Sequence, residues 1–394
     1  MNTSDQDGSQ HKRLVLCFDG TAKTFAGDQT DSNVVKIYQM LDRTAEDQYH
    51  YYQPGIGTYI EGDSSYGFFH DLRAFFTMGL DQALGLSFRH HVIAGYQFLM
   101  RYYSPGDYIY IIGFSRGAYT ARFLAEMLHK IGLLSRGNEE LVSFAWKTFS
   151  DYQTTRKASS AEQSGKHADK EKYMEDFKKT FCRGDNPNTP INEGVGVHFL
   201  GLFDCVNSVG QFDLPLASSS FQHIPTQGIA THIRHAVSIN ERRIKFKPAL
   251  FKYENNFSDG DVKEVWFAGA HGDIGGGWPR ARDESRTLST LALKWMIREI
   301  INLPKTADKL KFGTEWAPLE NECIDVATLA DKTEGSRDDL DRFVLVKDDK
   351  PPVFPRPHDE LEFGRGGGSI GALFWRFIGN DPLTLMILSS AYRV

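Results

Sequence analysis

Apolar runs and amphipathic stretches alternate along roughly the first 300 residues of the chain. Short apolar runs that stop at a glycine or a polar residue are typical of buried strands, and longer stretches with apolar positions three and four apart predict helices. We expect strands at 14–18, 49–53, 107–112, 195–203 and 262–270. Helices are expected at 33–41, 66–103, 118–134, 226–239 and 287–302. This alternation predicts an α/β fold with a mostly parallel central sheet and helices on both faces.

Changes of composition predict one domain with additions. Residues 1–13 are polar and are expected to be a disordered tail, while 14–394 form a single α/β domain. Within it, 135–190 is polar, charged and poor in glycine, which predicts a helical insertion that could cover a site as a cap. Residues 301–394 contain a proline-rich stretch and a glycine run, and we expect them to form a C-terminal extension packed on the core.

The segment Gly113-Phe114-Ser115-Arg116-Gly117 lies between a predicted strand and a predicted helix. This is the setting of a nucleophile elbow, in which a tight turn presents a serine hydroxyl above a sheet and flanking glycines avoid steric overlap. The N–H of Arg116 would face the same space from the helix N-terminus and could stabilise an oxyanion. A turn without chemistry is the alternative, but the strand before and the helix after favour a nucleophilic Ser115.

A nucleophilic serine needs a base, and hydrolases of this architecture place an acid and then a histidine after the serine in the chain. Asp204 follows the predicted strand at 195–203, and His271 follows the one at 262–270. We therefore expect His271 to take the proton from the serine and to return it to the leaving group. Asp204 would hold the histidine in the correct tautomer.

Other assignments of the acid and the base stay open. Asp204 could instead cap the helix that follows it, because aspartate is a common N-cap residue. Asp273 lies two residues from His271 and competes for a role. His358 lies late in the chain and is the strongest rival base, although the strand context places His271 ahead of it.

Asp19-Gly20-Thr21 follows the first predicted strand. The backbone N–H of Gly20 or Thr21 could supply a second oxyanion donor at this turn. A phosphatase with an aspartate nucleophile would show DxDGT at the same place. Cys17 stands where that nucleophile is required, so this class of phosphatase is excluded.

A metal cluster of Asp19, Asp204, His271 and Asp273 is a weaker alternative. Oxygen ligands with one imidazole could hold magnesium or manganese, and Asp19 and Asp273 would then serve a metal-assisted phosphoester hydrolase. That interpretation leaves Ser115 unexplained. We therefore predict neither a metal nor a cofactor.

Composition narrows the class of protein. The 394 residues are 41% hydrophobic, and the net charge of −6 argues against a protein that mainly coats nucleic acid. Four cysteines without a CxxC spacing suggest neither a disulfide framework nor a structural zinc site. The sequence shows no secretory signal and no transmembrane helix, which predicts a cytoplasmic location. Export by a route that reads no N-terminal signal stays open.

Together, these motifs resemble the α/β-hydrolase family catalogued as domain of unknown function 2235 (DUF2235), which includes the phospholipase effectors of bacterial type VI secretion. The matching stretches, in family order, are LCFDGT (16–21), DSNVVKIYQML (31–41), YYQPGIGT (51–58), GFSRGAYTARFLAEML (113–128), GLFDCVNSVG (201–210), RHAVSINERR (234–243) and VWFAGAHGDIGGGW (265–278). The GFSRGA and AHGDIGGG pieces are the specific ones.

The resemblance implies an α/β-hydrolase fold and a serine lipolytic hydrolase or esterase. The family nucleophile falls on Ser115, the acid on Asp204 and the histidine on His271. The chain departs from the family at 22–23, where Ala-Lys replaces an aromatic residue and Asn, and at 240–241, where Asn-Glu stands for Asp-Glu.

We therefore predict a serine hydrolase that cleaves carboxylic esters through a Ser-His-Asp triad and an acyl-enzyme. The alternatives are a catalytically silent binding protein of the same fold and the metal-assisted phosphoester hydrolase. The expected partner is an ester or lipid substrate, with transient contact to a membrane surface and no nucleic acid, and the oligomeric state is left open. Aromatic residues at 66–76 could line an acyl pocket, but a core helix is the stronger interpretation.

Overall fold

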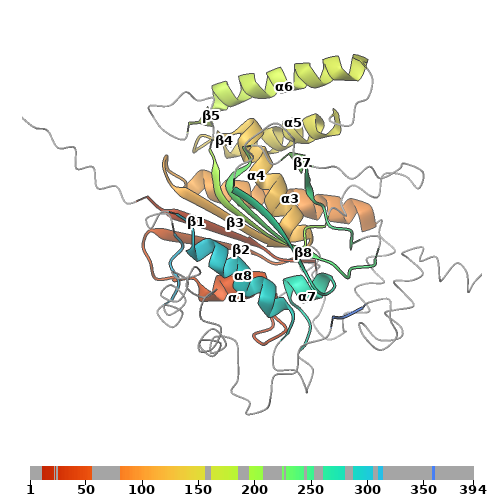
Figure 1. Ribbon diagram of the computed structural model, residues 1–394. Coiled ribbons are helices and arrows are strands. Elements are labelled where there is room, and N and C mark those ends of the chain that lie inside the picture. The colour runs from red at the N-terminus through yellow and green to blue at the C-terminus, as the bar shows by residue number, and fades with distance from the viewer. Residues whose placement is uncertain are drawn as a thin grey trace, which may run out of the picture.

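The computed structural model describes the α/β core on which the site depends (Figure 1). The described residues are 11–21, 23, 25–55, 80–155, 161–184, 195–206, 224–225, 228–243, 246–252, 261–279, 287–304, 309–313 and 357–359. Most of the predicted tail at 1–13, the aromatic stretch at 66–76 and most of the predicted extension at 301–394 lie outside them.

Six strands form one sheet in which every neighbouring pair is parallel. They are β1 (Arg13–Phe18), β2 (Gln48–Gln53), β3 (Tyr108–Phe114), β6 (Val197–Phe203), β8 (Ala230–Ser238) and β10 (Asp261–Phe267), in the order β10-β8-β6-β3-β1-β2. The predicted α/β class is confirmed. The chain direction across the sheet reverses between β1 and β3, and sites in such sheets form outside the carboxyl ends of the strands at this reversal.

Helices cover both faces of the sheet (Figure 1). One face carries α3 (Leu80–Tyr102) and α4 (Arg116–Ile131), and the other carries α1 (Asn33–Met40), α7 (His271–Gly275) and α8 (Ser289–Ile301). No helix within the described ranges is long and apolar enough to cross a membrane.

The region predicted as an insertion contributes helices that pack outside α4 (Figure 1). These are the 3-10 helix η1 (Glu139–Leu141), α5 (Val142–Thr155) and α6 (Ala161–Phe181). Two short strand pairs complete the described chain, β4 (Leu133–Leu134) antiparallel to β5 (Cys182–Arg183), and β7 (Ile224–Pro225) parallel to β9 (Phe251–Lys252). A role of this region as a cap stays a prediction.

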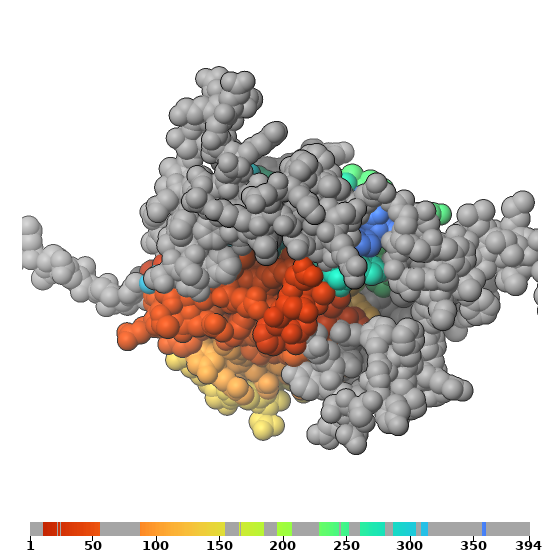
Figure 2. Space-filling view, turned by 90° about the horizontal axis from the view of Figure 1, so that it is seen from below, coloured from red at the N-terminus to blue at the C-terminus, as the bar shows by residue number. Residues whose placement is uncertain are grey.

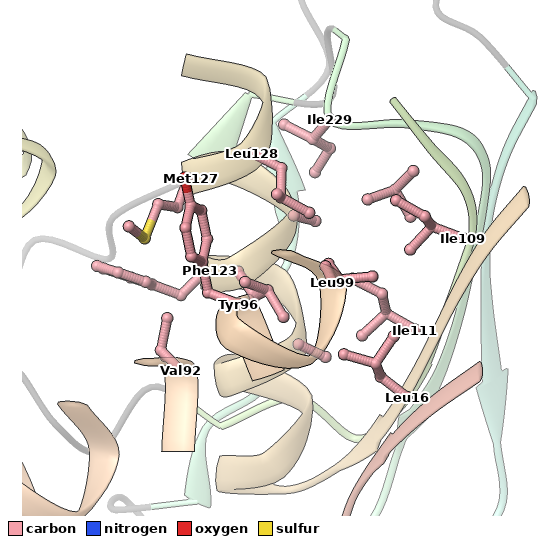
Figure 3. Packing of buried hydrophobic residues seen from close by; sticks show 14 of the residues in the cluster. Leu16, Val92, Tyr96, Leu99, Ile109, Ile111, Phe123, Met127, Leu128 and Ile229 are labelled. Atoms are coloured by element: carbon pink, nitrogen blue, oxygen red, sulfur yellow. The ribbon is translucent and has the colours of Figure 1, made fainter. Parts of the chain in front are cut away.

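Alternating side chains give the sheet two apolar faces. Leu16 of β1 joins Ile111 of β3 and Leu99 of α3 in the core beneath α3 and α4 (Figure 3). Leu14 of β1 belongs to the same core. Val15 belongs to the second core, beneath α1 and α8. Burying a side chain of this size contributes about 1.5–3 kcal/mol. Because both faces are covered, these central strands are apolar runs, which is the pattern that the sequence shows.

The expectation of a helix at 226–239 is wrong, because this segment contains the central strand β8. His232 and Arg234 are buried in that strand, and both are bonded to Asp261 of the neighbouring strand β10. Arg234 also donates to Glu299 of α8. These residues look like a solvated helical face in the sequence, but their partners are distant in the chain and allow them to be buried.

The first helix, α1, is capped by Ser32. Ser32 Oγ accepts a hydrogen bond of 3.1 Å from the N–H of Val35. Asn33 is fully buried, and its Nδ2 donates to the carbonyl oxygens of Ile274 (2.8 Å) and Ser289 (2.9 Å). Asn33 therefore ties α1 to the end of α7 and to the start of α8.

Candidate active site

Ser115 lies at the sharp turn between β3 and α4. Its φ of 58° and ψ of −123° are rare for a residue with a side chain, so the turn holds backbone strain. Glycine is needed on both sides because a Cβ on Gly113 would lie 2.6 Å from the Cα of Ala118, and one on Gly117 would overlap the carbonyl oxygen of Phe18. The turn therefore meets the steric requirements of a serine presented as a nucleophile.

A chain of hydrogen bonds joins Ser115, His271 and Asp204. His271 Nε2 lies 2.7 Å from Ser115 Oγ, and His271 Nδ1 lies 2.7 Å from Asp204 Oδ2. The three side chains follow three different strands, and none is more than 6% exposed. With a carboxylate at Nδ1, a neutral imidazole carries its proton there and accepts the hydroxyl hydrogen of the serine at Nε2.

The carboxylate of Asp204 is fully buried and held by hydrogen-bond donors. Ser238 donates to Oδ1 from its backbone N–H and from its hydroxyl, each at 2.9 Å, and His271 donates to Oδ2. The backbone at Asp204 has a φ of 41°, and its N–H donates to the carbonyl oxygen of Ala236 at 2.7 Å. These bonds offset the cost of burying a charge, and they direct the carboxylate to the histidine.

His271 is the first residue of α7 and is held on several sides. Its N–H donates to Glu241 Oε2 at 3.2 Å, and its ring lies 4.8 Å from the ring of Phe114 and 4.9 Å from that of Phe246 between centroids. Arg243 donates to the Glu241 carboxylate and lies over the Phe246 ring. These contacts restrict the orientation of the imidazole.

Ser238, Glu241 and Phe246 are site residues that sequence reasoning missed. Ser238 is the last residue of β8 and lies within the segment 226–239 that we expected to be a helix, so its position beside the acid could not be inferred. The departure at 240–241 from the family pattern was the one signal that pointed near Glu241.

The oxyanion candidates lie around Ser115. Arg116 is the first residue of α4, and a Cβ on Gly20 would lie 3.4 Å from the Cβ of Ser115. The Gly20 N–H is directed to Asp19 Oδ1 at 2.7 Å. The hydroxyl of Thr21 is buried and has no hydrogen-bond partner within the described part of the chain. The backbone N–H groups of Arg116 and Thr21 are therefore the better candidates for oxyanion donors.

Asp19 stabilises the turn after β1 through its hydrogen bonds. Its buried carboxylate accepts from Ser32 Oγ and Tyr52 Oη, each at 2.8 Å, as well as from the N–H of Gly20. Burial raises the pKa of Asp19, and the three hydrogen bonds oppose that rise. Asp19 therefore fixes the loop that carries Gly20 and Thr21.

Asp273 and His358 are bonded to each other beside the histidine. The carboxylate of Asp273 accepts from the backbone N–H of His358 at 2.8 Å and from its Nδ1 at 2.7 Å. The ring of His358 is stacked on that of Trp278, with 4.6 Å between centroids. It is His271, rather than the rival His358, that bonds to the hydroxyl of Ser115.

The four residues of the alternative metal cluster do not converge. Asp19 is bonded to Ser32 and Tyr52, while Asp273 is bonded to His358. Within the described ranges, no group of three or more histidine, cysteine or acidic side chains is placed to hold a metal ion.

The model of one protein family, the T6SS phospholipase effector Tle1-like catalytic domain, matches residues 12–299, which include the serine, the acid and the histidine. The chain belongs to the Tle1-like family. This membership confirms the resemblance to DUF2235 that the motifs indicated.

Other proteins match this chain over part of its length. An uncharacterized protein of Saccharomyces cerevisiae (YEL023C) is 39% identical over 249 residues, which are 62% of this chain and 33% of that protein, so the match spans about a third of the relative. A solved uncharacterized protein from Pseudomonas aeruginosa has a TM-score of 0.41 and 18% identity, covering 79% of this chain and 48% of its own. The Tle1 effector bound to the VgrG spike of the type 6 secretion system has a TM-score of 0.32 and 18% identity, covering 68% and 51%.

Proposed function

We propose that the protein is a serine hydrolase that cleaves the carboxylic esters of lipids through an acyl-enzyme. The observation that carries the proposal is the unbroken chain of hydrogen bonds from Ser115 through His271 to Asp204, each of 2.7 Å. It lies at the carboxyl ends of parallel strands, where sites in such sheets form. Membership in a family of phospholipase effectors supports phospholipids as the substrate class.

Acylation begins at the serine hydroxyl. His271 Nε2 removes the proton from Ser115 Oγ as this oxygen attacks the carbonyl carbon of the ester. The negative charge that develops on the carbonyl oxygen is stabilised by the backbone N–H of Arg116 and by that of Thr21. When the tetrahedral intermediate collapses, the bond to the leaving oxygen breaks, and His271 gives its proton to the departing alcohol.

Deacylation repeats the same steps with water. His271 takes a proton from a water molecule, the hydroxide attacks the acyl carbon, and Ser115 Oγ leaves and recovers the proton. The free acid and the free serine result. Asp204 offsets the positive charge of the imidazolium, and Ser238 holds its carboxylate in place by donating to Oδ1.

A fluorophosphonate probe and an ester panel test the proposal. We expect the wild type to be labelled and to hydrolyse p-nitrophenyl esters and phospholipid vesicles, and Ser115→Ala to lose both properties while its melting temperature is retained. His271→Ala should lower turnover by a factor close to that of Ser115→Ala, because triad residues act as a unit. Asp359→Asn, which breaks an ion pair to the partly exposed Arg242, is the matched control.

Two outcomes would replace the proposal with its alternatives. Hydrolysis of phosphoesters that stops with a chelator and survives in Ser115→Ala would indicate metal-assisted chemistry. A folded protein with neither labelling nor hydrolysis of any ester would indicate a binding protein of the same fold.

A further inference from the structure

Residues 357–359 lie against the helix that carries the histidine of the site. In Figure 2 these residues, in blue, lie at the surface beside the teal residues around α7. The bonds between His358 and Asp273 bridge 85 positions of the chain, and Asp273 itself is 2% exposed. The proposed chemistry uses neither residue, so this contact between a half-buried histidine and a buried carboxylate needs another explanation.

Asp273 links His358 to the start of α7. Its carboxylate accepts from the N–H of Ala270, at 3.0 Å, in addition to the two donors of His358. A buried carboxylate that loses hydrogen bonds is costly, so Asp273 would turn toward other donors if His358 were absent. Such a turn would release the N–H of Ala270, which is the residue directly before His271.

Other contacts also hold this helix. Asn33 holds its far end through the carbonyl oxygen of Ile274. The backbone on either side is glycine with positive φ, 121° at Gly269 and 88° at Gly276, a conformation that glycine adopts without a steric penalty. The near end of α7 is held by the bond to Glu241 described above and by Asp273, so a change in the partners of Asp273 acts directly on this end.

We propose that Asp273, His358 and Trp278 form a clasp that positions the imidazole ring of His271 for proton transfer with Ser115. The inference rests on the proposed function. The clasp residues are positioning residues, because they act on the imidazole through the backbone of α7. Trp278 holds the His358 ring by stacking, and the ring then presents Nδ1 to the carboxylate. A displacement of about 1 Å in a reacting group can cost roughly 100-fold in rate.

Substitutions at His358 separate the clasp from a merely structural contact. His358→Leu removes the Nδ1 donor, and His358→Asn keeps a donor at nearly the same place. With a soluble p-nitrophenyl ester, we expect His358→Leu to lower kcat by about 10- to 100-fold with KM unchanged, and His358→Asn to recover most of the loss. Asp359→Asn, which alters the next residue of the same segment, should stay within about twofold of the wild type in this assay.

A spectroscopic measurement keeps the clasp testable apart from catalysis. The downfield proton resonance of His271 Nδ1–H, assigned by its loss in His271→Gln, should shift or broaden in His358→Leu and return in His358→Asn. If the activity of the wild type does not depend on Ser115, the proposed function fails, and this resonance alone decides on the clasp. Unchanged kcat and an unchanged resonance in His358→Leu would overturn the clasp. So would a folded His358→Asn that is as slow as His358→Leu.

Discussion

Asp204→Asn is the sharpest test of the triad, because the structure determines which way the new amide must face. Ser238 directs its backbone N–H to Oδ1, so an amide oxygen has to occupy that position. The amide NH₂ then replaces Oδ2, which lies 2.7 Å from His271 Nδ1. Two donors cannot face each other at this distance, so the histidine must change its tautomer, and Nδ1 becomes an acceptor.

The new tautomer carries its proton on Nε2, which faces the hydroxyl of Ser115. A nitrogen that already holds a proton cannot accept another without becoming charged, so the serine loses its base. Trapping the wrong tautomer in a triad lowers kcat by about 10⁴-fold, which corresponds to about 5 kcal/mol of transition-state stabilisation. The fold should survive, because asparagine keeps the volume of the fully buried side chain.

The assay is the hydrolysis of a soluble p-nitrophenyl ester, with the rate of fluorophosphonate labelling as a measure of the first chemical step. Both rates should fall together, and KM should change little. Asp359→Asn serves again as the control for removing one carboxylate elsewhere. A folded Asp204→Asn protein that keeps more than about a tenth of the wild-type kcat would refute the assignment of Asp204 as the acid.

Three further predictions concern single groups around the triad. Ser238→Ala removes one hydrogen bond to the buried carboxylate and should lower kcat about tenfold; a value equal to that of the wild type would speak against a role for this hydroxyl. Ser115→Gly should be more stable than Ser115→Ala by about 1 kcal/mol in urea unfolding, because only glycine accepts the positive φ without strain, and equal stabilities would contradict the strained turn. Burial raises the pKa of Asp19, so its contribution to stability is lost as pH rises. The free energy of unfolding of the wild type should therefore fall relative to that of Asp19→Asn as the pH rises above about 4; a constant difference would refute this.

The sequence located the triad candidates because each of them follows an apolar run. In a parallel sheet the carboxyl ends of all strands share one edge, so Ser115, Asp204 and His271 could be grouped without knowing the strand order. The tight Gly-x-Ser-x-Gly turn added a local requirement that can be read directly from spacing. What these signals predict is a shared edge, whereas the contacts between the side chains come from the structure.

The interpretation failed where burial depends on partners distant in the chain. The strand β8 carries His232, Arg234 and His235, which a local pattern assigns to a polar face. Each is buried because an acidic residue reaches it from β10 or α8, as Glu264 does for His235 at 2.8 Å between Oε1 and Nδ1. No periodicity within the strand could reveal these pairs. Because β8 was not predicted, Ser238 at its end was placed within a helix, and its position beside the acid was missed.

The strand order explains why the histidine needs a glycine-rich loop. From β3, which ends at the serine, to β10, which precedes the histidine, the sheet takes three steps of about 4.8 Å, or roughly 14 Å. His271 therefore has to return across the ends of β8 and β6 to reach Ser115. The return is close, because the ring of Phe114 occupies the place where a Cβ of Gly275 would lie. Asp204 follows β6 and Ser238 ends β8, which are the two strands that the loop crosses. The strand order therefore places the carboxylate next to the imidazole.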